Sequence, residues 1–319
     1  MSAQTVSILI PCWNAERYVA QAVASALGQS WPAVEVIVVD DGSTDGSRAV
    51  LEAFGDRIRL IATPNQGAWK ARNTALQAAQ GTFVKYLDAD DLLFPNTVEQ
   101  QVRAAQNLPD TAFVYGRIYR LEQTTGRLHP HSARDRRANN HDGLTDLLID
   151  VPVTTAPLYR KAQLQTLGGF REGVVLRDDF DLFVRAVLAG FDPVGDPSPV
   201  YCYRDHDDTA RLSRRASAAD YAGLVSMYEH HLSLLAARSA SDATQQIAVG
   251  LAKSMWITGR NALRLGYRDS AAHLFKMATQ CAPDQAVYGR WPYQLLTRAL
   301  GPFRAEAALA MVRKGGRRR

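Results

Sequence analysis

The first part of the chain alternates between short apolar runs and amphipathic segments. Continuous apolar runs predict buried strands, and apolar residues at every third or fourth position predict helices. The predicted strands are Val6–Pro11, Val34–Val39, Ile58–Ala62 and Thr82–Leu87. Because a helical pattern separates each strand from the next, we expect an α/β fold: a mostly parallel sheet covered by helices on both faces.

The rest of the chain continues this pattern and then changes character. Apolar runs at Phe113–Leu121 and Val200–Arg204 predict two more strands, whereas the polar, aperiodic segment His129–Asp142 predicts a mobile loop. From residue 213 onward the sequence is rich in alanine and leucine at helical spacing. We therefore expect two domains, residues 1–212 with the sheet and residues 213–319 as a helical appendage.

The helical region contains a weak repeat signal. Asp242–Leu265 and Ser270–Cys281 form a predicted helix pair, and its small and aromatic residues partly follow the tetratricopeptide pattern. The matching positions are Gly259, Gly266, Ala271, Phe275, Ala278 and Pro283. A single unit of this kind cannot bury its own apolar face, so we expect it to pack on the sheet domain or on another subunit.

Three carboxylates stand where the fourth predicted strand ends, at Asp88, Asp90 and Asp91. Like charges this close repel unless a cation or hydrogen-bond donors neutralise them. Carboxylate oxygens are preferred ligands of Mg²⁺ and Mn²⁺, and substrate phosphates commonly complete the coordination shell. The cluster predicts a metal site, although an acidic turn before the next helix would also explain it.

Polar and aromatic residues also follow the first two strands. Pro11, Trp13 and Asn14 come after the first, and Asp40 and Asp41 after the second; Asn14 is also the predicted N-cap of the next helix. Open parallel sheets bind ligands beyond the carboxyl ends of their strands, so we expect these residues in one site with the acidic cluster. Trp13 could stack on a nucleobase and Asp41 could accept a base N–H, while loop packing and Asp-Gly turn chemistry are the structural alternatives.

A second acidic cluster, Asp178, Asp179 and Asp181, opens a predicted helix that Gly190 ends. The helix macrodipole favours carboxylates in a first turn, which would suffice as a structural explanation. A carboxylate at the start of a helix also has the fixed position that a general base requires.

Bulk composition narrows the class of protein without identifying it. The chain has 319 residues, 46% hydrophobic and 22% charged, with a net charge of +5. Three scattered cysteines argue for a reducing compartment, and neither a membrane-spanning run nor a signal peptide is expected. The basic tail Arg313–Arg319 is too short to predict nucleic-acid binding and leaves open a contact with an anionic membrane.

The region after the first strand lacks a glycine-rich phosphate loop of either common type. This absence disfavours dinucleotide-dependent oxidoreductases and P-loop enzymes. A nucleotidyltransferase acting on sugar phosphates would share the sheet and the metal carboxylates but should carry a glycine-rich, basic triphosphate loop. A non-catalytic scaffold would be expected to lose Asp90 or Asp179, and both are present.

Four segments together resemble the GT-A nucleotide-sugar-binding domain of the family 2 inverting glycosyltransferases. They are Val6–Asn14, Val36–Ser47, Asn65–Leu76 and Gly81–Pro95. Arg177–Leu182 further resembles the family's E-D-x-D-L element, with Asp178 in place of the usual glutamate. The resemblance implies a GT-A fold, a Rossmann-like sheet flanked by helices, followed here by the C-terminal helical region.

The resemblance also implies roles for individual residues. Asp179 would be the catalytic base, with Asp178 and Asp181 beside it on the acceptor side. Asp90 would bind the metal together with Asp88, and His206 would approach the metal or the phosphates. The residues implied in nucleotide binding are Pro11, Trp13, Asn14, Asp41, Lys70, Arg72 and Asp88.

The activity implied is transfer of a sugar, with inversion, from a nucleoside diphosphate sugar to a saccharide or glycolipid hydroxyl. The donor would be UDP-linked and the cofactor Mn²⁺ or Mg²⁺, in the synthesis of cell-surface polysaccharide. We expect a cytoplasmic protein, and the C-terminal helices and basic tail leave open a peripheral contact with the inner face of the membrane or with another protein.

Overall fold

The computed structural model describes residues 4–122, 124–132, 143–205 and 216–316, with side chains up to residue 311. These residues form two compact units. The first takes the described residues of Met1–Asp142 and Asp150–Arg215, and the second takes Gly143–Ile149 and the described residues from Ala216 onward. The short segment at 143–149 therefore belongs with the C-terminal helices, although it lies within the predicted first domain.

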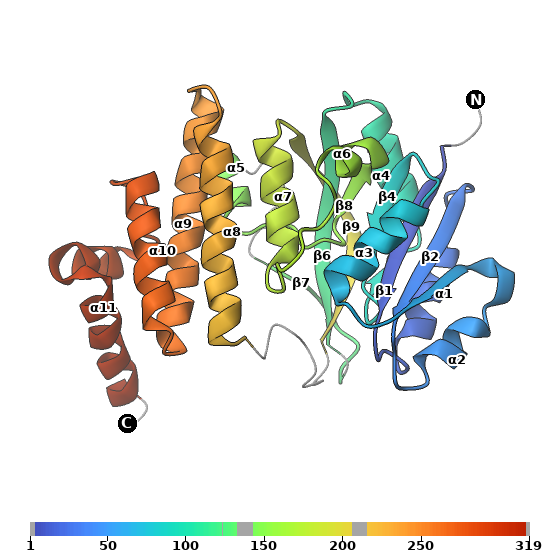
Figure 1. The fold of residues 1–319 in the computed structure, drawn as a ribbon, viewed down its shortest axis with the longest axis horizontal. Helices are drawn as coiled ribbons and strands as arrows, with labels where there is room; N and C mark the ends of the chain where they lie inside the picture. The colour runs from blue at the N-terminus through green and yellow to red at the C-terminus, as the bar shows by residue number, and fades with distance from the viewer. Residues whose placement is uncertain (1–3, 123, 133–142, 206–215, 317–319) are drawn as a thin grey trace. The chain divides into compact units, whose positions relative to one another are not determined.

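The first unit is built on one sheet in the order β3-β2-β1-β4-β8-β6-β9-β5, with β7 beside β6 (Figure 1). Its strands are β1 (Val6–Cys12), β2 (Val34–Asp41), β3 (Arg59–Thr63), β4 (Phe83–Tyr86), β5 (Leu92–Leu93), β6 (Ala112–Glu122), β7 (Leu128–Pro130), β8 (Pro157–Arg160) and β9 (Asp192–Asp205).

The two halves of this sheet differ in strand direction. Strands β3, β2, β1 and β4 are all parallel, as the alternating pattern predicts. In the other half β8 runs antiparallel to both β4 and β6, and β5 runs antiparallel to β9, so the complete sheet is mixed. The parallel half places the ends of β1, β2 and β4 along one edge.

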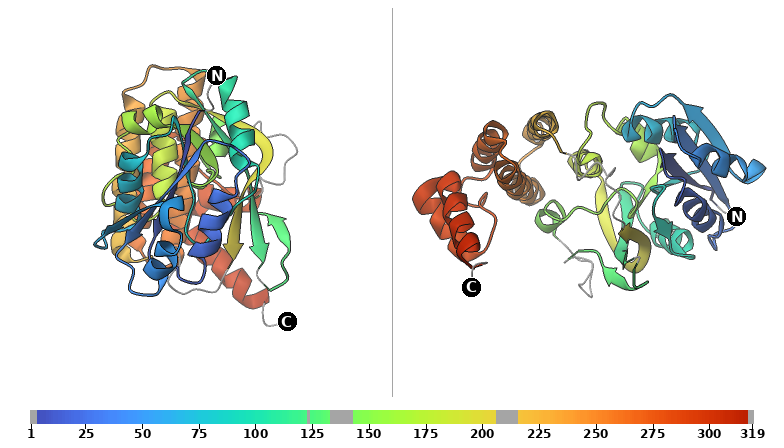
Figure 2. Two further views of the ribbon diagram at one scale, coloured as in Figure 1. Left: turned by 90° about the vertical axis from the view of Figure 1, so that its right-hand side faces the viewer. Right: turned by 90° about the horizontal axis from the view of Figure 1, so that it is seen from below.

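Helices cover both faces of this sheet (Figure 2). They are α1 (Val19–Leu27), α2 (Ser47–Glu52), α3 (Ala68–Ala78), α4 (Thr97–Gln106), α6 (Lys161–Thr166) and α7 (Asp178–Leu188), with a 3₁₀ turn at Gly55–Arg57. α1 and α4 pack on one face, and α3 packs on the opposite face of β1 and β2. α7 lies on the α3 face. There the rings of Phe183 and Phe113 pack edge to face, with their centres 5.5 Å apart.

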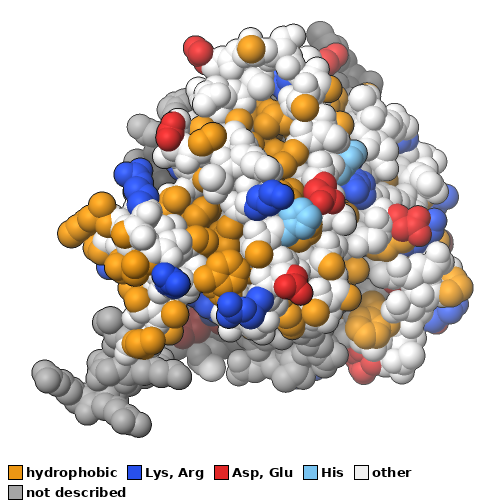
Figure 3. Space-filling model, turned by 60° about the vertical axis from the view of Figure 1, so that its left-hand side comes forward, with side chains coloured by type: hydrophobic (Ala, Val, Ile, Leu, Met, Phe, Trp, Pro, Cys, Tyr) orange, Lys and Arg blue, Asp and Glu red, His pale blue; other side chains and the backbone are white. Residues whose placement is uncertain are grey.

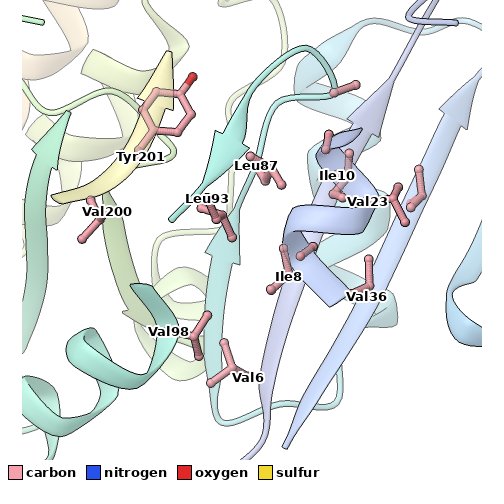
Figure 4. Close-up of a cluster of buried hydrophobic side chains, with 14 of the residues drawn as sticks. Val6, Ile8, Ile10, Val23, Val36, Leu87, Leu93, Val98, Val200 and Tyr201 are labelled. Carbon is pink, nitrogen blue, oxygen red and sulfur yellow. The ribbon is translucent and has the colours of Figure 1, made fainter. Parts of the chain in front are cut away.

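The alternation of side chains along β1 explains its continuous apolar sequence. Val6, Ile8 and Ile10 enter the core beneath α1 and α4, and Leu9 is equally buried on the other face (Figure 4). Because both faces are covered, a polar residue would lose hydration on either side. Burial on both faces therefore explains the apolar sequences of β1, β2 and β4, whereas β3, at the edge of the sheet, is only partly buried.

One charged side chain lies inside the apolar strand β4. Lys85 is fully buried, and its Nζ donates to Gln101 Oε1 at 2.7 Å and to the Ala156 carbonyl at 3.1 Å. Burial lowers the pKa of Lys85 well below its ordinary value. The lysine thereby links β4, α4 and the segment before β8 through hydrogen bonds.

The described residues of the second unit form helices joined by short turns and loops, with no strand among them. It contains α5 (Leu144–Leu147), α8 (Ala218–Ala236), α9 (Asp242–Arg264), α10 (Arg268–Cys281) and α11 (Trp291–Gly316). α9 and α10 pack side by side (Figure 1), and a Cβ at Gly259 would approach the Phe275 ring to 3.0 Å. α11 consists of two helical stretches, because Gly301 has φ 77° and ψ 164°.

Two local expectations are wrong. Asn14 does not cap α1, which begins after Tyr18; it adopts φ 48° and binds the next loop instead. The segment predicted as a loop from His129 begins inside β7, which pairs with β6. The rest of that predicted loop, residues 133–142, lies outside the described residues.

Candidate functional site

The loops after β1 and β2 hold each other at the edge where the parallel strands end. The Asn14 backbone N–H donates to Ser43 Oγ at 3.1 Å, and Asn14 Oδ1 accepts from the Thr44 N–H at 2.7 Å. Trp13, beside this contact, is 50% exposed. Its ring is therefore an accessible aromatic surface at the strand edge, which is compatible with the predicted base stacking.

Asp41 is one of two buried carboxylates at the end of β2; it is 3% exposed, and Asp40 is 2% exposed. The two oxygens of Asp41 accept from the backbone N–H groups of Gln66 at 3.0 Å and Gly67 at 2.8 Å, and Thr63 also donates to it. Asp41 thus fixes the loop that leads into α3. The predicted contact with a nucleobase stays a prediction, and the base would have to share an oxygen that already accepts from this loop.

The acidic cluster after β4 divides into two kinds of carboxylate. Asp91 is 1% exposed and accepts from the Tyr201 hydroxyl and from the Arg204 backbone N–H, at 2.6 Å for the latter. Burial, together with Asp90 and Asp88, raises its pKa well above the ordinary value. Asp88 and Asp90 are only partly buried. Asp91 therefore ties β9 to the strand tip, and the other two are the accessible carboxylates.

Arg72 joins the two acidic clusters. Its Nη2 donates to Asp88 Oδ1 at 2.8 Å and its Nη1 donates to Asp178 Oδ2. The guanidinium carbon lies 5.2 Å from the centre of the Phe170 ring, and the residue is 8% exposed. Burial alone would lower the pKa of Arg72, but Asp178 and Asp88 raise it, so the group stays charged. The two clusters, 90 residues apart in sequence, thus lie in one site.

The start of α7 presents Asp178 and Asp179. Arg177 precedes them in the left-handed conformation, φ 60°, and its guanidinium stacks on Phe180 at 3.9 Å. Asp179 Oδ1 accepts from the Phe180 N–H at 2.7 Å. Burial raises the pKa of Asp178 to about 6 despite Arg72, and burial also raises the pKa of Asp179. A carboxylate with a raised pKa can take a proton near neutral pH.

Asp181 has a different environment on the same helix. It is 1% exposed, and it binds Arg185 Nε at 2.7 Å and Arg171 Nη1 at 3.2 Å. Arg185 also donates to the carbonyls of Leu167 and Gly169. Asp181 therefore holds the preceding loop against α7 through these two arginines, which is a structural role.

The loop before α7 is also joined to α3. Asn73 Nδ2 donates to the Phe170 carbonyl and Asn73 Oδ1 accepts from the Phe170 N–H, both at 2.8 Å. Gly169 has φ 69°, and a Cβ there would lie 2.3 Å from Asn73 Oδ1. Glycine is therefore required at 169. Both polar atoms of the Asn73 side chain are thus occupied by this loop. Of the residues predicted near the nucleotide, Lys70 is on the same helix, with its Nζ 5.7 Å from the centre of the Trp69 ring.

Tyr86 is a residue of the site that sequence reasoning missed. It is fully buried, its ring meets Phe170 edge to face at 5.2 Å, and its hydroxyl has no hydrogen-bond partner among the described residues. The residue lies at the end of an apolar run, so nothing in the local pattern separates it from a core aromatic.

The accessible carboxylates suit a hard divalent cation. Asp88 and Asp90 supply oxygen donors, and solvent reaches both. The described residues contain no group of three or more His, Cys, Asp and Glu side chains able to hold a metal by themselves. Two carboxylates are enough where substrate phosphates complete the shell. His206, the third predicted ligand, lies outside the described residues.

Comparison with known structures identifies the class of fold. The structure of S. aureus TarS 1–349 in complex with UDP-GlcNAc is similar over 98% of this chain and 92% of that chain, with a TM-score of 0.75 and 18% identity. The structure of a mannosyltransferase from Pyrobaculum calidifontis, in complex with GDP-Man and Mn²⁺, is similar over 97% of this chain and 87% of that chain, with a TM-score of 0.60 and 18% identity. The fold is GT-A, followed by C-terminal helices.

The sequence comparisons place the chain within a family. Residues 7–167 match the model described as glycosyl transferase family 2, and the chain belongs to that family. A putative teichuronic acid biosynthesis glycosyltransferase, TuaG of Bacillus subtilis, is 43% identical over 101 residues, 30% of this chain and 40% of that protein. The chain spans between 19% and 61% of the length of four other curated relatives.

In the part of the chain that the structure describes, none of the helices has the length and apolarity needed to cross a membrane.

Proposed function

We propose that this protein transfers a sugar, with inversion, from a UDP-linked sugar to a hydroxyl group of a saccharide or glycolipid acceptor. The observation that carries the proposal is the Arg72 bridge, because it brings the donor-side carboxylate Asp88 and the base-side carboxylate Asp178 together. Membership of family 2 supports the same activity. The named B. subtilis relative supports a place in cell-surface polysaccharide synthesis.

Asp179 is the base in this proposal. Its carboxylate is fixed at the start of α7 by the Phe180 N–H, and its raised pKa suits proton transfer from a hydroxyl near neutral pH. Arg72 holds Asp178, which is a second carboxylate beside Asp179. As the acceptor oxygen attacks the anomeric carbon, Asp179 takes its proton.

On the donor side, Asp90 and Asp88 would hold Mn²⁺ or Mg²⁺. When bound, such an ion neutralises charge that develops on the diphosphate leaving group. Trp13 would stack on the base, Asp41 would accept from it, and Pro11, Asn14 and Lys70 would complete the nucleotide site. Arg72 would orient Asp88 toward the diphosphate.

The direct test is release of UDP from a panel of UDP-sugars in the presence of Mn²⁺. We expect turnover with at least one donor. In Asp90→Asn the rate of UDP release should fall about a hundredfold or more, because mutating even a residue that only supports a metal ligand lowers activity about 10–100-fold. Binding is read separately, as stabilisation of the folded protein by UDP with Mn²⁺ and its loss in the variant.

Two results would contradict the proposal. Formation of pyrophosphate from a nucleoside triphosphate and a sugar phosphate would indicate a nucleotidyltransferase. Stabilisation by UDP without release from any donor and acceptor in the panel would indicate a non-catalytic scaffold. An Asp90→Asn variant with full activity would remove the metal assignment alone.

A further inference from the structure

The first helical stretch of α11, residues 291–300, exposes an apolar face. Trp291 is 72% exposed and Leu295 is 55% exposed, and one helical turn separates them on the same side. Arg298 continues this side and is also exposed. Tyr288, 40% exposed, lies just before the helix. Large apolar side chains gathered on an exposed helix face mark an interaction surface more often than an ordinary surface.

The opposite side anchors this stretch within the second unit. Tyr293 is 4% exposed, its hydroxyl accepts from Trp256 Nε1 at 3.1 Å, and the Arg260 guanidinium stacks on its ring at 3.8 Å. Thr297 is 6% exposed on the same side. The inward side is therefore already packed, and the outward position of Trp291 and Leu295 follows from the fold.

The same part of the chain carries a concentrated positive charge. Residues 285–319 contain eight Lys or Arg and one acidic residue, Glu306, so the segment carries +7 and the remainder of the chain −2. Glu306 is 7% exposed and forms ion pairs with Arg260 and Arg264. Arg290 and Arg298 are exposed beside the apolar face. Figure 3, drawn with the C-terminal helices forward, shows hydrophobic side chains with Lys and Arg side chains among them.

We propose that this face, formed by Tyr288, Arg290, Trp291, Leu295 and Arg298, docks the protein on an anionic lipid bilayer. Tryptophan and leucine enter the boundary between headgroups and acyl chains, and arginines beside them bind anionic headgroups. A single apolar contact gives marginal binding, and stable anchoring takes an apolar and a basic element together. Trp291 and Leu295 supply the apolar element, and Arg290 and Arg298 supply the basic one.

The positive charge of this face favours a bilayer over a second copy of the chain as its binding partner. A two-fold contact through this face would bring the arginines of one copy close to those of the other, and like charges in contact are unfavourable. A bilayer with anionic headgroups complements the charge and takes up the apolar residues.

The test is co-sedimentation of the full chain with vesicles of phosphatidylcholine, with and without phosphatidylglycerol. We expect binding to the anionic vesicles only, weakening as salt is raised. In Arg290→Gln/Arg298→Gln the partition constant should fall about thirtyfold, since each basic residue near the surface contributes about fivefold. In Trp291→Ser/Leu295→Ser it should fall about tenfold or more.

The matched control is Arg127→Gln/Leu128→Gln, which removes an exposed arginine and an exposed leucine from the first unit. It should bind vesicles as the unchanged protein does. Because none of these residues belongs to the proposed catalytic site, UDP release without vesicles should be the same in all variants. Equal binding to neutral vesicles, no binding, or helix variants that bind normally would overturn the proposal. It would also be overturned if the helix variants changed only the oligomeric state.

Discussion

The two acidic clusters of the first unit look alike in sequence and differ in how their carboxylates are held. In each, one aspartate is buried and fully engaged: Asp91 by Tyr201 and a backbone N–H, Asp181 by two arginines. In each, other aspartates are partly buried at the site, Asp88 and Asp90 in one and Asp178 and Asp179 in the other. Each cluster therefore combines carboxylates suited to chemistry with one that secures the backbone.

The clusters also differ in what neutralises them. Arg171 and Arg185 neutralise Asp181 completely within the α7 region. Asp88 and Asp178 share the single guanidinium of Arg72, so this one cation serves both clusters. The comparison teaches that partners, more than residue type, separate the carboxylates proposed to bind a metal from the structural ones.

The largest effect expected is that of Asp179→Asn. Removing the proposed base should lower the rate of UDP release with acceptor about a thousandfold. The free energy of unfolding, measured with urea, should change by less than about 1 kcal/mol, because only one hydrogen bond to a backbone N–H is weakened. The control is Glu172→Gln, at an exposed residue of the preceding loop, and it should change neither the rate nor the free energy of unfolding. Normal turnover in Asp179→Asn would remove the base assignment.

Arg72→Lys should have the next largest effect. An ammonium group cannot hold two carboxylates in the fork geometry of a guanidinium, so one of Asp88 and Asp178 would be left without its partner. We expect a loss of about 3 kcal/mol in unfolding free energy, as for other broken buried pairs, and weaker binding of UDP with Mn²⁺. Arg103→Lys, in an exposed pair with Glu99, should change neither. An unchanged Arg72→Lys would mean that the bridge is not required.

Asp181→Asn and Asp91→Asn compare the two structural carboxylates. Asp181→Asn leaves two arginines without a buried negative charge and should cost about 3 kcal/mol. Asp91 accepts from neutral donors, so Asp91→Asn should cost only about 1 kcal/mol. Urea unfolding of the purified variants measures both. Equal losses would show that the partner charges do not distinguish the two positions.

The smallest effect expected is in the pH dependence. A general base works only when unprotonated, and a raised pKa moves loss of activity to higher pH. Because burial raises the pKa of Asp179, the rate should begin to fall at a higher pH than it would with an ordinary aspartate as the base. Asp178→Asn removes a neighbouring negative charge and should move this limb to lower pH. A fall in rate centred at the ordinary aspartate value of about 3.9 would exclude a raised pKa at the base.

Much of the fold follows from local pattern. The four apolar runs became the parallel strands, and the helix pair at α9 and α10 lies close to its expected bounds. The insertion of β8 between β4 and β6 was not predicted, because nothing local specifies with which strand a short segment pairs. The burial of Lys85 inside an apolar strand could not be predicted either, because its hydrogen-bond partners lie on α4 and near β8, far from it in sequence.

In the candidate site, the sequence predicts the residue types better than their partners. Both acidic clusters were expected at strand and helix ends, but the Arg72 bridge spans 16 and 106 residues and has no local signature. The left-handed Arg177 could not be predicted, since glycine and asparagine are the usual residues in that conformation. Asn14 was misread because a cap residue and a loop-binding residue have the same chemistry.

The reciprocal hydrogen bonds between the Asn73 side chain and the Phe170 backbone have a consequence for protein engineering. They join Phe170 to the α3 framework, while Glu172, Gly173 and Val175 further along the loop are exposed. A chimera that exchanges only residues 172–176 with those of a relative would keep this junction intact. Such grafts offer a way to vary this exposed stretch while the junction with α3 is kept constant.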